Sequence, residues 1–430
     1  MLRRVDLRGE QADAAAVLGP SPNGGGVDPA LETVRAIIAD VRSRGDAALR
    51  DTTAHFDGVQ LDAIRVEPEV VARAWEEAPA DLRSALELAA SRIRSYHEAQ
   101  RDAAGEPGWS DAGITVGELV RPVGRAGLYV PGGRAAYPST VLMTAIPARV
   151  AGVAELALCV PPGADGMPPA STLAAAHLAG VDEVYRVGGA QAIAALAYGT
   201  ESIRAVDVIV GPGNRYVSLA KGEVSGDVGI DSLAGPSELV VIADGATPAE
   251  FVALDLMAQA EHGPDGTAVV IAWDAAVLDA VEAALADLVV DAPRRAEIES
   301  NFAGGGVSVL VRDAAQAVAV SNLVAPEHLE LAVADPEPLL GLVECAGAVF
   351  CGPWAPAVVG DYVAGPNHVL PTGRTARFAS ALRVDTFRKH IHVVRMDREA
   401  LGGVAPAIAT LTASEGLAAH GASVAKRVGS

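Results

Sequence analysis

Gln259 and His262 lie three residues apart in the stretch DLMAQAEHG, and both side chains can bind a small ligand. Apolar residues recur at helical spacing from Pro248 onward and a Gly-Pro pair ends the pattern, so a helix is predicted over 248–262. Residues three apart project from one face of a helix, so the amide and the imidazole can reach one object. Two interpretations stay open: a metal site that takes further ligands from elsewhere, or a hydrogen-bonded polar network.

Glu327 and His328 form a second candidate pair, in the segment APEHLE. Pro326 suits the first position of a helix, so the pair is expected in a first helical turn. Adjacent side chains on a helix diverge by about 100°, so the two can present separate bases to a site. The alternative is a solvated first turn in which the helix dipole stabilises the carboxylate.

Two later segments also combine a carboxylate with an imidazole. Asp361 and His368 lie in GDYVAGPNHVLPT, a loop punctuated by glycine and proline, and polar residues on such loops more often serve a site than a core. Glu415 and His420 lie five residues apart in the Ala-rich segment EGLAAH, where a lone histidine belongs by default to the core or the surface. The first segment is the stronger candidate.

Short apolar strands and single helices alternate over most of the chain, and this alternation predicts parallel βαβ units. Before it, residues 28–56 and 80–102 are expected to be helical, followed by two strands in ITVGELVRPV and GRAGLYV. The last fifty residues are expected to form one strand, HIHVVRM, and helices. The alternating strands are predicted at 156–160, 183–187, 206–210, 238–245, 268–273, 307–311 and 348–351, with helices at 171–178, 190–197, 214–224, 248–262 and from 276.

An α/β fold with two lobes follows from this pattern. Domains of about 100–150 residues are the most common, so 430 residues suit two or three of them. We expect a small N-terminal arm at 1–25, a first lobe at 26–128 and 238–380, a second lobe at 129–237, and a small C-terminal helical appendage at 381–430.

Three glycine-rich turns in the expected second lobe each pass from a strand into a helix: GLYVPGG, VGGAQ and IVGPGN. Free backbone N–H groups at such turns can face a phosphate, as in dinucleotide sites of α/β proteins. None matches G-x-G-x-x-G, and any one of them could be only a tight connection. Three in one lobe favour a nucleotide site, with Tyr129, Gln191 and Asn214 as the side chains able to contact a base or ribose.

The composition argues against several classes of partner and location. The net charge of −21 disfavours a nucleic-acid or anionic-membrane partner. The most apolar window, 141–160, is interrupted by Pro147, Arg149 and Glu155. The stretch MLRRVDLRGE lacks the apolar core of a signal peptide, so a cytoplasmic protein is expected.

Three cysteines are too few and too irregularly spaced for a disulfide framework. Cys159 and Cys345 lie in an apolar run and a helical segment, so both are expected to be buried small hydrophobes. Cys351 follows the strand-like AGAVF and precedes Gly352, a place where a catalytic thiol could be displayed, and it stays a rival candidate for a nucleophile.

Five segments in chain order, IDSLAGPSE, DLMAQAEHGPD, APEHLEL, GDYVAGPNHVLPT and EGLAAHG, resemble histidinol dehydrogenases. Any one would be weak, but five in register over the whole chain are highly specific, and no departure is seen at the positions that matter. The resemblance implies two Rossmann-like lobes related to the aldehyde dehydrogenase architecture. It also implies a homodimer in which the segment 381–430 crosses to the partner.

The resemblance implies one zinc ion per subunit, held in the first lobe, with part of the site supplied in trans. The zinc ligands that it implies are Gln259, His262, Asp361 and His420. The substrate contacts that it implies are those four ligands with Ser237, His328 and Glu415, and His368 lies close by. Glu415 and His420 would complete the other subunit's site.

The resemblance also assigns the chemistry. It makes Glu327 and His328 the acid–base residues, and it places NAD at Tyr129, Gln191 and Asn214. The implied reaction is the four-electron oxidation of L-histidinol through L-histidinal to L-histidine with two NAD molecules in succession, the last step of L-histidine biosynthesis.

The assigned roles agree with the chemistry of each step. An alcohol loses its O–H proton as hydride leaves carbon, so a neutral imidazole suits the first oxidation, and His328 is assigned to it. The aldehyde must add water before its own hydride can leave, which needs a base, and Glu327 is assigned to that step. Zinc would hold the substrate's imidazole and amine nitrogens, so its contribution is mostly positioning.

Three other functions stay in competition with this one. An aldehyde dehydrogenase would use Cys351 as its nucleophile. A zinc hydrolase would use Glu327 to activate a metal-bound water and would need no NAD. A non-catalytic ligand-binding protein of two lobes would leave the Glu-His pair without a purpose.

Overall fold

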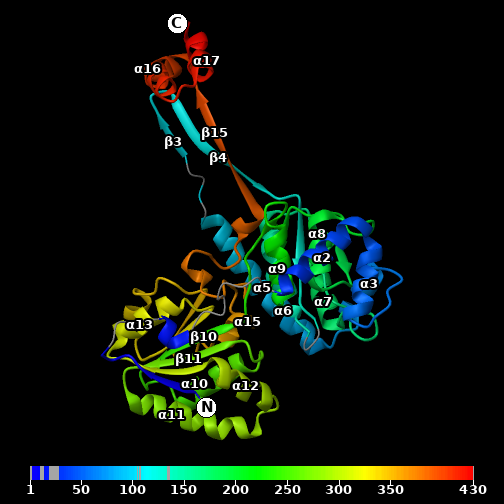
Figure 1. Cartoon of the computed structure of the whole chain (residues 1–430), viewed down its shortest axis with the longest axis vertical. Helices are drawn as coiled ribbons and strands as arrows, with labels where there is room; N and C mark the ends of the chain where they lie inside the picture. The colour runs from blue at the N-terminus through cyan, green and yellow to red at the C-terminus, as the bar shows by residue number, and fades with distance from the viewer. Residues whose placement is uncertain are drawn as a thin grey trace.

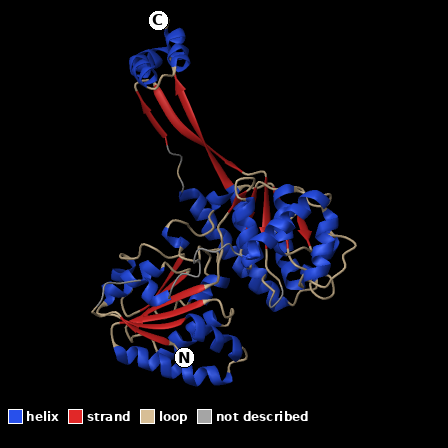
Figure 2. Cartoon of the chain, in the orientation of Figure 1, coloured by secondary structure: helices blue, strands red, loops and turns tan. Residues whose placement is uncertain are grey.

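The computed structural model describes residues 2–9, 14–18, 29–103, 105, 108–132 and 136–429. Two α/β lobes lie side by side, and a long arm extends from them to the C-terminal helices (Figures 1 and 2). We name the lobes the β10 lobe and the β5 lobe after a central strand of each. No helix in the described ranges is both long and apolar enough to cross a membrane.

The β10 lobe contains a six-stranded parallel sheet in the order β1-β12-β11-β10-β13-β14. Helices cover both faces, which is why the central strands β10 and β11 are almost continuous apolar runs. The helices α10, α11 and α12 pack on one face, and α1, α13 and α14 pack on the other. The strands are β1 (Arg3–Asp6), β10 (Glu238–Ala243), β11 (Thr267–Ala272), β12 (Gly306–Leu310), β13 (His328–Ala332) and β14 (Ala348–Cys351). The helices are α1 (Ala14–Leu18), α10 (Ala249–Ala260), α11 (Ala275–Leu288), α12 (Arg295–Gly305), α13 (Ala314–Val324), α14 (Glu337–Leu340) and α15 (Ala357–Tyr362), with the 3-10 turn η1 (Val289–Asp291).

The β5 lobe contains a second six-stranded sheet in the order β2-β7-β6-β5-β8-β9, parallel except for β2. Here α4 to α7 cover one face, and α2, α3, α8 and α9 cover the other. The strands are β2 (Arg65–Val66), β5 (Arg125–Tyr129), β6 (Glu155–Cys159), β7 (Glu183–Tyr185), β8 (Val208–Val210) and β9 (Gly229–Ile230). The helices are α2 (Pro29–Arg44), α3 (Asp46–Phe56), α4 (Pro68–Glu76), α5 (Ala80–Ala103), α6 (Pro138–Ala151), α7 (Ala170–Ala179), α8 (Gly189–Tyr198) and α9 (Arg215–Val224).

The arm is a three-stranded antiparallel sheet that carries two helices at its tip (Figure 1). It consists of β3 (Gly108–Asp111), β4 (Ile114–Pro122) and β15 (Arg388–Met396), followed by α16 (Arg398–Ser414) and α17 (Ala418–Val428). The 3-10 turns η2 (Thr375–Arg377) and η3 (Val384–Phe387) lead into β15. Within α16 and α17 only Ala400 is buried, so the tip has almost no core of its own.

The predicted alternation of strands and helices is confirmed, but one domain boundary is wrong. We expected residues 26–128 to belong to the same lobe as 238–380. Instead α2, α3, α4 and α5 pack on the β5 sheet, for example through Val34 and Leu49 on one face and Ile93 on the other. An amphipathic helix shows that it covers a sheet, but its sequence does not say which one.

The expected N-terminal arm is also corrected. Residues 3–6 form β1, the edge strand that pairs in parallel with β12. The sequence RRVD shows too little alternation of polar and apolar residues to predict a strand. It forms one because its backbone pairs with a segment about 300 positions away. Residues 10–13 and 19–28, which include the loop PSPNGGG, lie outside the described residues.

Candidate active site

The acid–base and ligand candidates of the β10 lobe meet at the amino-terminal ends of β10 and β13. Leu239 pairs with His328 across these two strands, so the residues just before each strand are neighbours. The helix α10 follows β10 and runs back, so its last turn, with Gln259, returns to the same edge. This edge faces the β5 lobe, because His368 on the adjoining loop is hydrogen-bonded to Thr140 of α6 at 2.9 Å.

Gln259 lies in the last turn of α10, and His262 lies two residues past the end of that helix at Ala260, so the helix predicted over 248–262 is slightly too long. Nδ1 of His262 lies 3.2 Å from the backbone oxygen of Gln259, so Nδ1 is the donor and the lone pair of Nε2 is left for a ligand. Oε1 of Gln259 lies 3.2 Å from Ser237 Oγ. Its Nε2 is buried without a hydrogen-bond partner among the described residues. Each of the two side chains therefore keeps a polar atom that can bind a ligand.

Glu327 is held by two donors from the start of β10. Ser237 Oγ donates to Glu327 Oε2 at 2.6 Å, and the backbone N–H of Glu238 donates to the same oxygen at 3.1 Å. Burial raises the pKa of Glu327 to about 7, although these two hydrogen bonds act to lower it. A carboxyl group with a pKa near neutrality can gain and lose a proton at working pH.

The expected helical turn at Glu327 and His328 is wrong, because His328 begins the strand β13. Ala325 takes a left-handed conformation with φ of 51° and ends α13, so Pro326 follows a helix and does not open one. All five residues of β13 are buried between β10 and β14. His328 Nδ1 lies 3.5 Å from Glu327 Oε2, so the two side chains are close neighbours, and their use as two separate bases stays a prediction.

The ring of His328 is oriented by the backbone of the neighbouring strand. Its Nδ1 lies 3.3 Å from the carbonyl oxygen of Glu238 and donates to it, which leaves the lone pair of Nε2 available. Nε2 lies 3.8 Å from Asp361 Oδ1, and the ring centroid lies 6.0 Å from that of Phe350. Burial lowers the pKa of His328, so the imidazole is neutral at pH 7 and can accept a proton.

Asp361 and His368 close the site from the loop after α15. The ring of His368 is fixed between Thr140 and the backbone oxygen of Asp361, 3.2 Å from its Nδ1. Burial lowers the pKa of His368 to about 4, so this ring stays neutral. Burial raises the pKa of Asp361, and the nearest basic groups to its carboxylate are His328 Nε2 and His368 Nδ1, each at 3.8 Å. A cation beside Asp361 would offset the cost of burying its charge.

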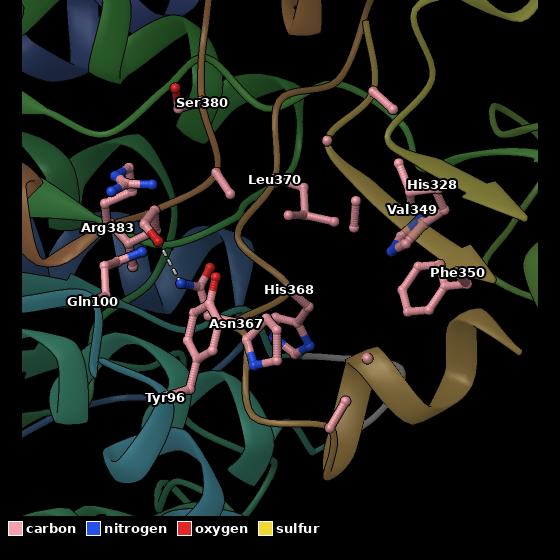
Figure 3. A pocket seen from close by; sticks show the side chains of 18 of the residues that line it. Tyr96, Gln100, His328, Val349, Phe350, Asn367, His368, Leu370, Ser380 and Arg383 are labelled. Carbon is pink, nitrogen blue, oxygen red and sulfur yellow. Dashed lines mark hydrogen bonds between the residues drawn. The ribbon is translucent and has the colours of Figure 1, made fainter. Parts of the chain in front are cut away.

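Two cavities meet at His328. A small one of about 50 Å³ is lined by Ser237, Gln259, His262, His328 and Asp361, among others. A larger one of about 410 Å³ lies between the lobes. Figure 3 shows His328 and Phe350 on one side of the larger cavity, Arg383 and Gln100 on the other, and Asn367 and His368 next to each other between them. The larger space can admit a ligand that reaches toward the residues of the smaller one.

Sequence reasoning missed Asp255 and Glu330, which also line the small cavity. Their carboxyl groups share a hydrogen bond, and burial raises the pKa of both, that of Asp255 to about 6. The signal was present. Asp255 stands four residues before Gln259 on one face of α10, and Glu330 stands two after His328 on one face of β13.

Glu415 and His420 lie far from this cluster within one subunit. Glu415 caps α16 and His420 lies in α17, both exposed, at the tip of the arm (Figure 1). Of the predicted ligand set, the chain therefore brings together Gln259, His262 and Asp361 but not His420.

The three glycine-rich turns gather at the carboxyl-terminal ends of β5, β7 and β8. The Tyr129 side chain is buried, and its hydroxyl accepts a hydrogen bond from the backbone N–H of Gly189 at 3.1 Å. Gln191 is buried in the first turn of α8. Asn214 caps α9, where its Oδ1 accepts from the backbone N–H groups of Tyr216 and Val217 at 3.0 and 3.1 Å. The Tyr129 and Asn214 side chains thus hold the turns in place.

Cys351 ends β14 and packs against the hydrophobic cluster on the sheet face opposite the site. Its neighbour Phe350 points the other way, toward His328, as alternation along a strand requires. Cys351 lines neither cavity, and burial raises the pKa of its thiol, which opposes formation of a thiolate. The geometry disfavours it as a nucleophile.

Comparison with known proteins gives close relatives over nearly the whole chain. A family model described as histidinol dehydrogenase matches residues 25–428. The histidinol dehydrogenase of Parasynechococcus marenigrum is 51% identical over 397 residues, which cover 92% of this chain and 90% of that protein. The crystal structure of histidinol dehydrogenase from Elizabethkingia anophelis matches with a TM-score of 0.94 at 32% identity, covering 99% of this chain and 98% of that chain.

A more distant likeness concerns the fold alone. An acetylating aldehyde dehydrogenase from Geobacillus thermoglucosidasius matches with a TM-score of 0.52 at 14% identity, covering 86% of this chain and 97% of that chain. The predicted fold class, two Rossmann-like lobes of the aldehyde dehydrogenase kind, is confirmed.

Proposed function

This chain belongs to the histidinol dehydrogenase family, and from that premise we propose that it oxidises L-histidinol through L-histidinal to L-histidine, with NAD as the oxidant and zinc in the site. One observation carries the proposal beyond the family. Side chains from β10, α10, β13 and α15 converge on one small cavity beside the space between the lobes. A cytoplasmic location is part of the same proposal.

The residues present fit a divalent cation. His262 offers the lone pair of Nε2, Gln259 offers the oxygen of its side-chain amide, and Asp361 offers a buried carboxylate. Bound there, zinc would supply a positive centre that holds the imidazole and amine nitrogens of the substrate. Ser237 fixes the amide of Gln259 in the required orientation.

His328 takes the hydroxyl proton of the alcohol in the first oxidation. Its Nδ1 is committed to the carbonyl oxygen of Glu238, so Nε2 is the basic atom, and it faces the shared side of the two cavities. The lowered pKa keeps this nitrogen unprotonated and ready at pH 7.

Glu327 takes a proton from the water that adds to the aldehyde before the second oxidation. Its pKa of about 7 lets it act as a base without a large energetic cost, and Ser237 and Glu238 hold one of its oxygens. The other oxygen is left to meet water.

The site is completed by a second subunit, which supplies His420 as the fourth ligand and Glu415 as a further substrate contact. Both residues lie exposed on an arm that stands away from their own lobes (Figure 1). In the described part of one subunit, no three His, Cys, Asp or Glu side chains form a group able to hold a metal. A shared ligand set accounts for both facts.

An exposed apolar surface beside the site is suited to receive the partner's α16 and α17. It is carried by α10, α15 and the loop between β14 and α15, and Trp354 within it is 83% exposed. Its residues are Phe251, Leu254, Trp354, Val358 and Tyr362. The tip of the arm presents apolar residues of its own, Leu411 and Leu417. Burial of both surfaces would stabilise the dimer.

A stoichiometric assay tests the proposal. The purified protein should form two molecules of NADH for each histidinol consumed, should lose this activity with a chelator, and should regain it with zinc. Cleavage of a peptide or amide without NAD would instead support a zinc hydrolase. Absence of any NADH with histidinol would refute the proposed function.

A further inference from the structure

We propose that Lys221 and Asp231 are positioning residues that hold the turn 211–214 in the shape needed to receive the dinucleotide. The inference rests on the proposed function, because it assumes that NAD binds in the crevice of the β5 lobe. It adds a role for two buried charged residues that the chemistry of the site does not use.

Lys221 and Asp231 together form hydrogen bonds with both backbone polar groups of Gly211. Lys221 Nζ donates to the carbonyl oxygen of Gly211 at 3.0 Å and forms an ion pair with Asp231 Oδ1. Asp231 Oδ2 accepts from the backbone N–H of Gly211 at 2.7 Å. The side chains of Lys221 and Asp231 are only 2% and 3% exposed. The peptide units on either side of Gly211 are therefore fixed.

Gly211 is the first residue of the turn that leads from β8 into α9. Gly211 has φ of 119°, and a Cβ atom there would lie 2.1 Å from the backbone oxygen of Tyr129. The turn is thus pressed against the end of β5, between β5 and β8, where the order of strands reverses direction. In parallel α/β sheets ligands bind in the crevice at this reversal. A small rotation of Gly211 would change how residues 212–214 face that crevice.

Burial of an ion pair requires the desolvation of two charged groups, which costs free energy. A pair of apolar side chains of similar volume is often as stabilising as a buried ion pair, or more so. Apolar side chains, however, could neither donate to the carbonyl oxygen of Gly211 nor accept from its N–H. The ion pair therefore fixes the geometry of the turn, which its packing alone would not do.

Asp231 also connects this turn to the other lobe. It follows β9, and its Oδ1 accepts from the N–H of Ser232 at 2.7 Å. The chain then passes Gly235, whose N–H is hydrogen-bonded to Thr372, and reaches Ser237, which holds Glu327. Only five residues thus lie between Asp231, which binds the turn, and Ser237, which is hydrogen-bonded to the proposed base.

The test compares NADH binding, measured by fluorescence titration, in the zinc-loaded wild type and in Asp231→Asn. Asparagine keeps the volume but removes the charge, and loss of charge-assisted hydrogen bonds predicts about tenfold weaker NADH binding. The KM for NAD should rise by a similar factor, while the KM for histidinol should stay unchanged. A second variant, Lys221→Met with Asp231→Leu, restores apolar packing and should fold, yet bind NADH equally weakly.

Arg125 and Glu183 supply a matched control. They form another ion pair in the same sheet, with side chains 8% and 14% exposed, but at the amino-terminal ends of β5 and β7, away from the turns. Glu183→Gln should lower thermal stability without weakening NADH binding. If Asp231→Asn binds NADH like the wild type, or if Glu183→Gln weakens binding as much, the positioning role is refuted. If the wild type itself binds no NADH, the proposed function falls as well, and the two failures are distinguishable.

Discussion

The two lobes have six-stranded sheets of the same general kind, yet their functional residues lie at opposite ends of the strands. The β5 lobe presents the carboxyl-terminal ends of its strands, where turns of backbone lead into α8 and α9. The β10 lobe presents the amino-terminal ends of β10 and β13, where side chains gather. The turns at these carboxyl-terminal ends lead into the amino termini of α8 and α9, a place in an α/β sheet that suits a phosphate. The second edge holds side chains that differ in proton affinity, and these suit proton transfer.

The difference shows how one chain separates cofactor binding from chemistry. Changes at the first edge should alter affinity for the cofactor, and changes at the second should alter turnover. Four predictions test this division, beginning with the largest expected effect.

Replacing His328 by Asn should lower kcat for histidinol oxidation by a factor of about 10² to 10⁴, because the proposed proton acceptor is removed. NADH affinity should stay at the wild-type value, since His328 lies on the β10 lobe. Stopped-flow rates and fluorescence titration measure the two quantities. A variant that turned over normally would break the assignment of chemistry to this edge.

His262→Asn and His420→Asn should each be nearly inactive, and mixing the two variants under conditions that exchange subunits should restore activity. Random pairing makes half of the dimers mixed, and each mixed dimer keeps one intact site, so about a quarter of wild-type activity is expected. Recovery is measured as NADH formation after mixing. No recovery would show that His262 and His420 do not act across subunits.

Oxidation of histidinal should rise with pH through about 7, because Glu327 has its pKa raised to about 7 by burial and acts as a base only when deprotonated. Below that pH the carboxyl group is protonated and the rate should fall. Glu327→Gln should be slow and should lose this limb of the profile. The same limb in the variant would assign the titration to another group.

Asn214→Ala should weaken NADH binding by about fivefold, since loss of a helix cap costs about 1 kcal/mol and loosens the turn before α9. Histidinol binding should not change. Asp313→Ala is the matched control, because Asp313 caps α13 in the other lobe by accepting from Gln316 N. Equal loss of NADH affinity in both variants would mean that general stability, and not the turn, is responsible.

Local patterns in the sequence predicted most of the elements. The helix that ends near Gln259 and His262 was predicted because its apolar spacing and its Gly-Pro stop are both local signals. The turn at Asn214 was predicted for the same reason, although the structure shows that its side chain caps a helix.

Errors arose where distant pairing decides the structure. Pro326 indicated a helix start, but pairing of β13 with two neighbouring strands made His328 the first residue of a strand. The helices before residue 104 gave no indication of which sheet they cover. The hydrogen bond of Ser237 to Glu327 joins residues 90 positions apart, so spacing alone could not show it.

The sparse packing at the end of the arm has a consequence for how the protein matures. The helices α16 and α17 bury a single alanine, so they cannot be stabilised by a core of their own. They depend on whatever surface they come to rest against. On the proposed function, that surface belongs to a sister chain beside its reaction centre, so a newly synthesised polypeptide gains its final helices and its working chemistry in a single encounter.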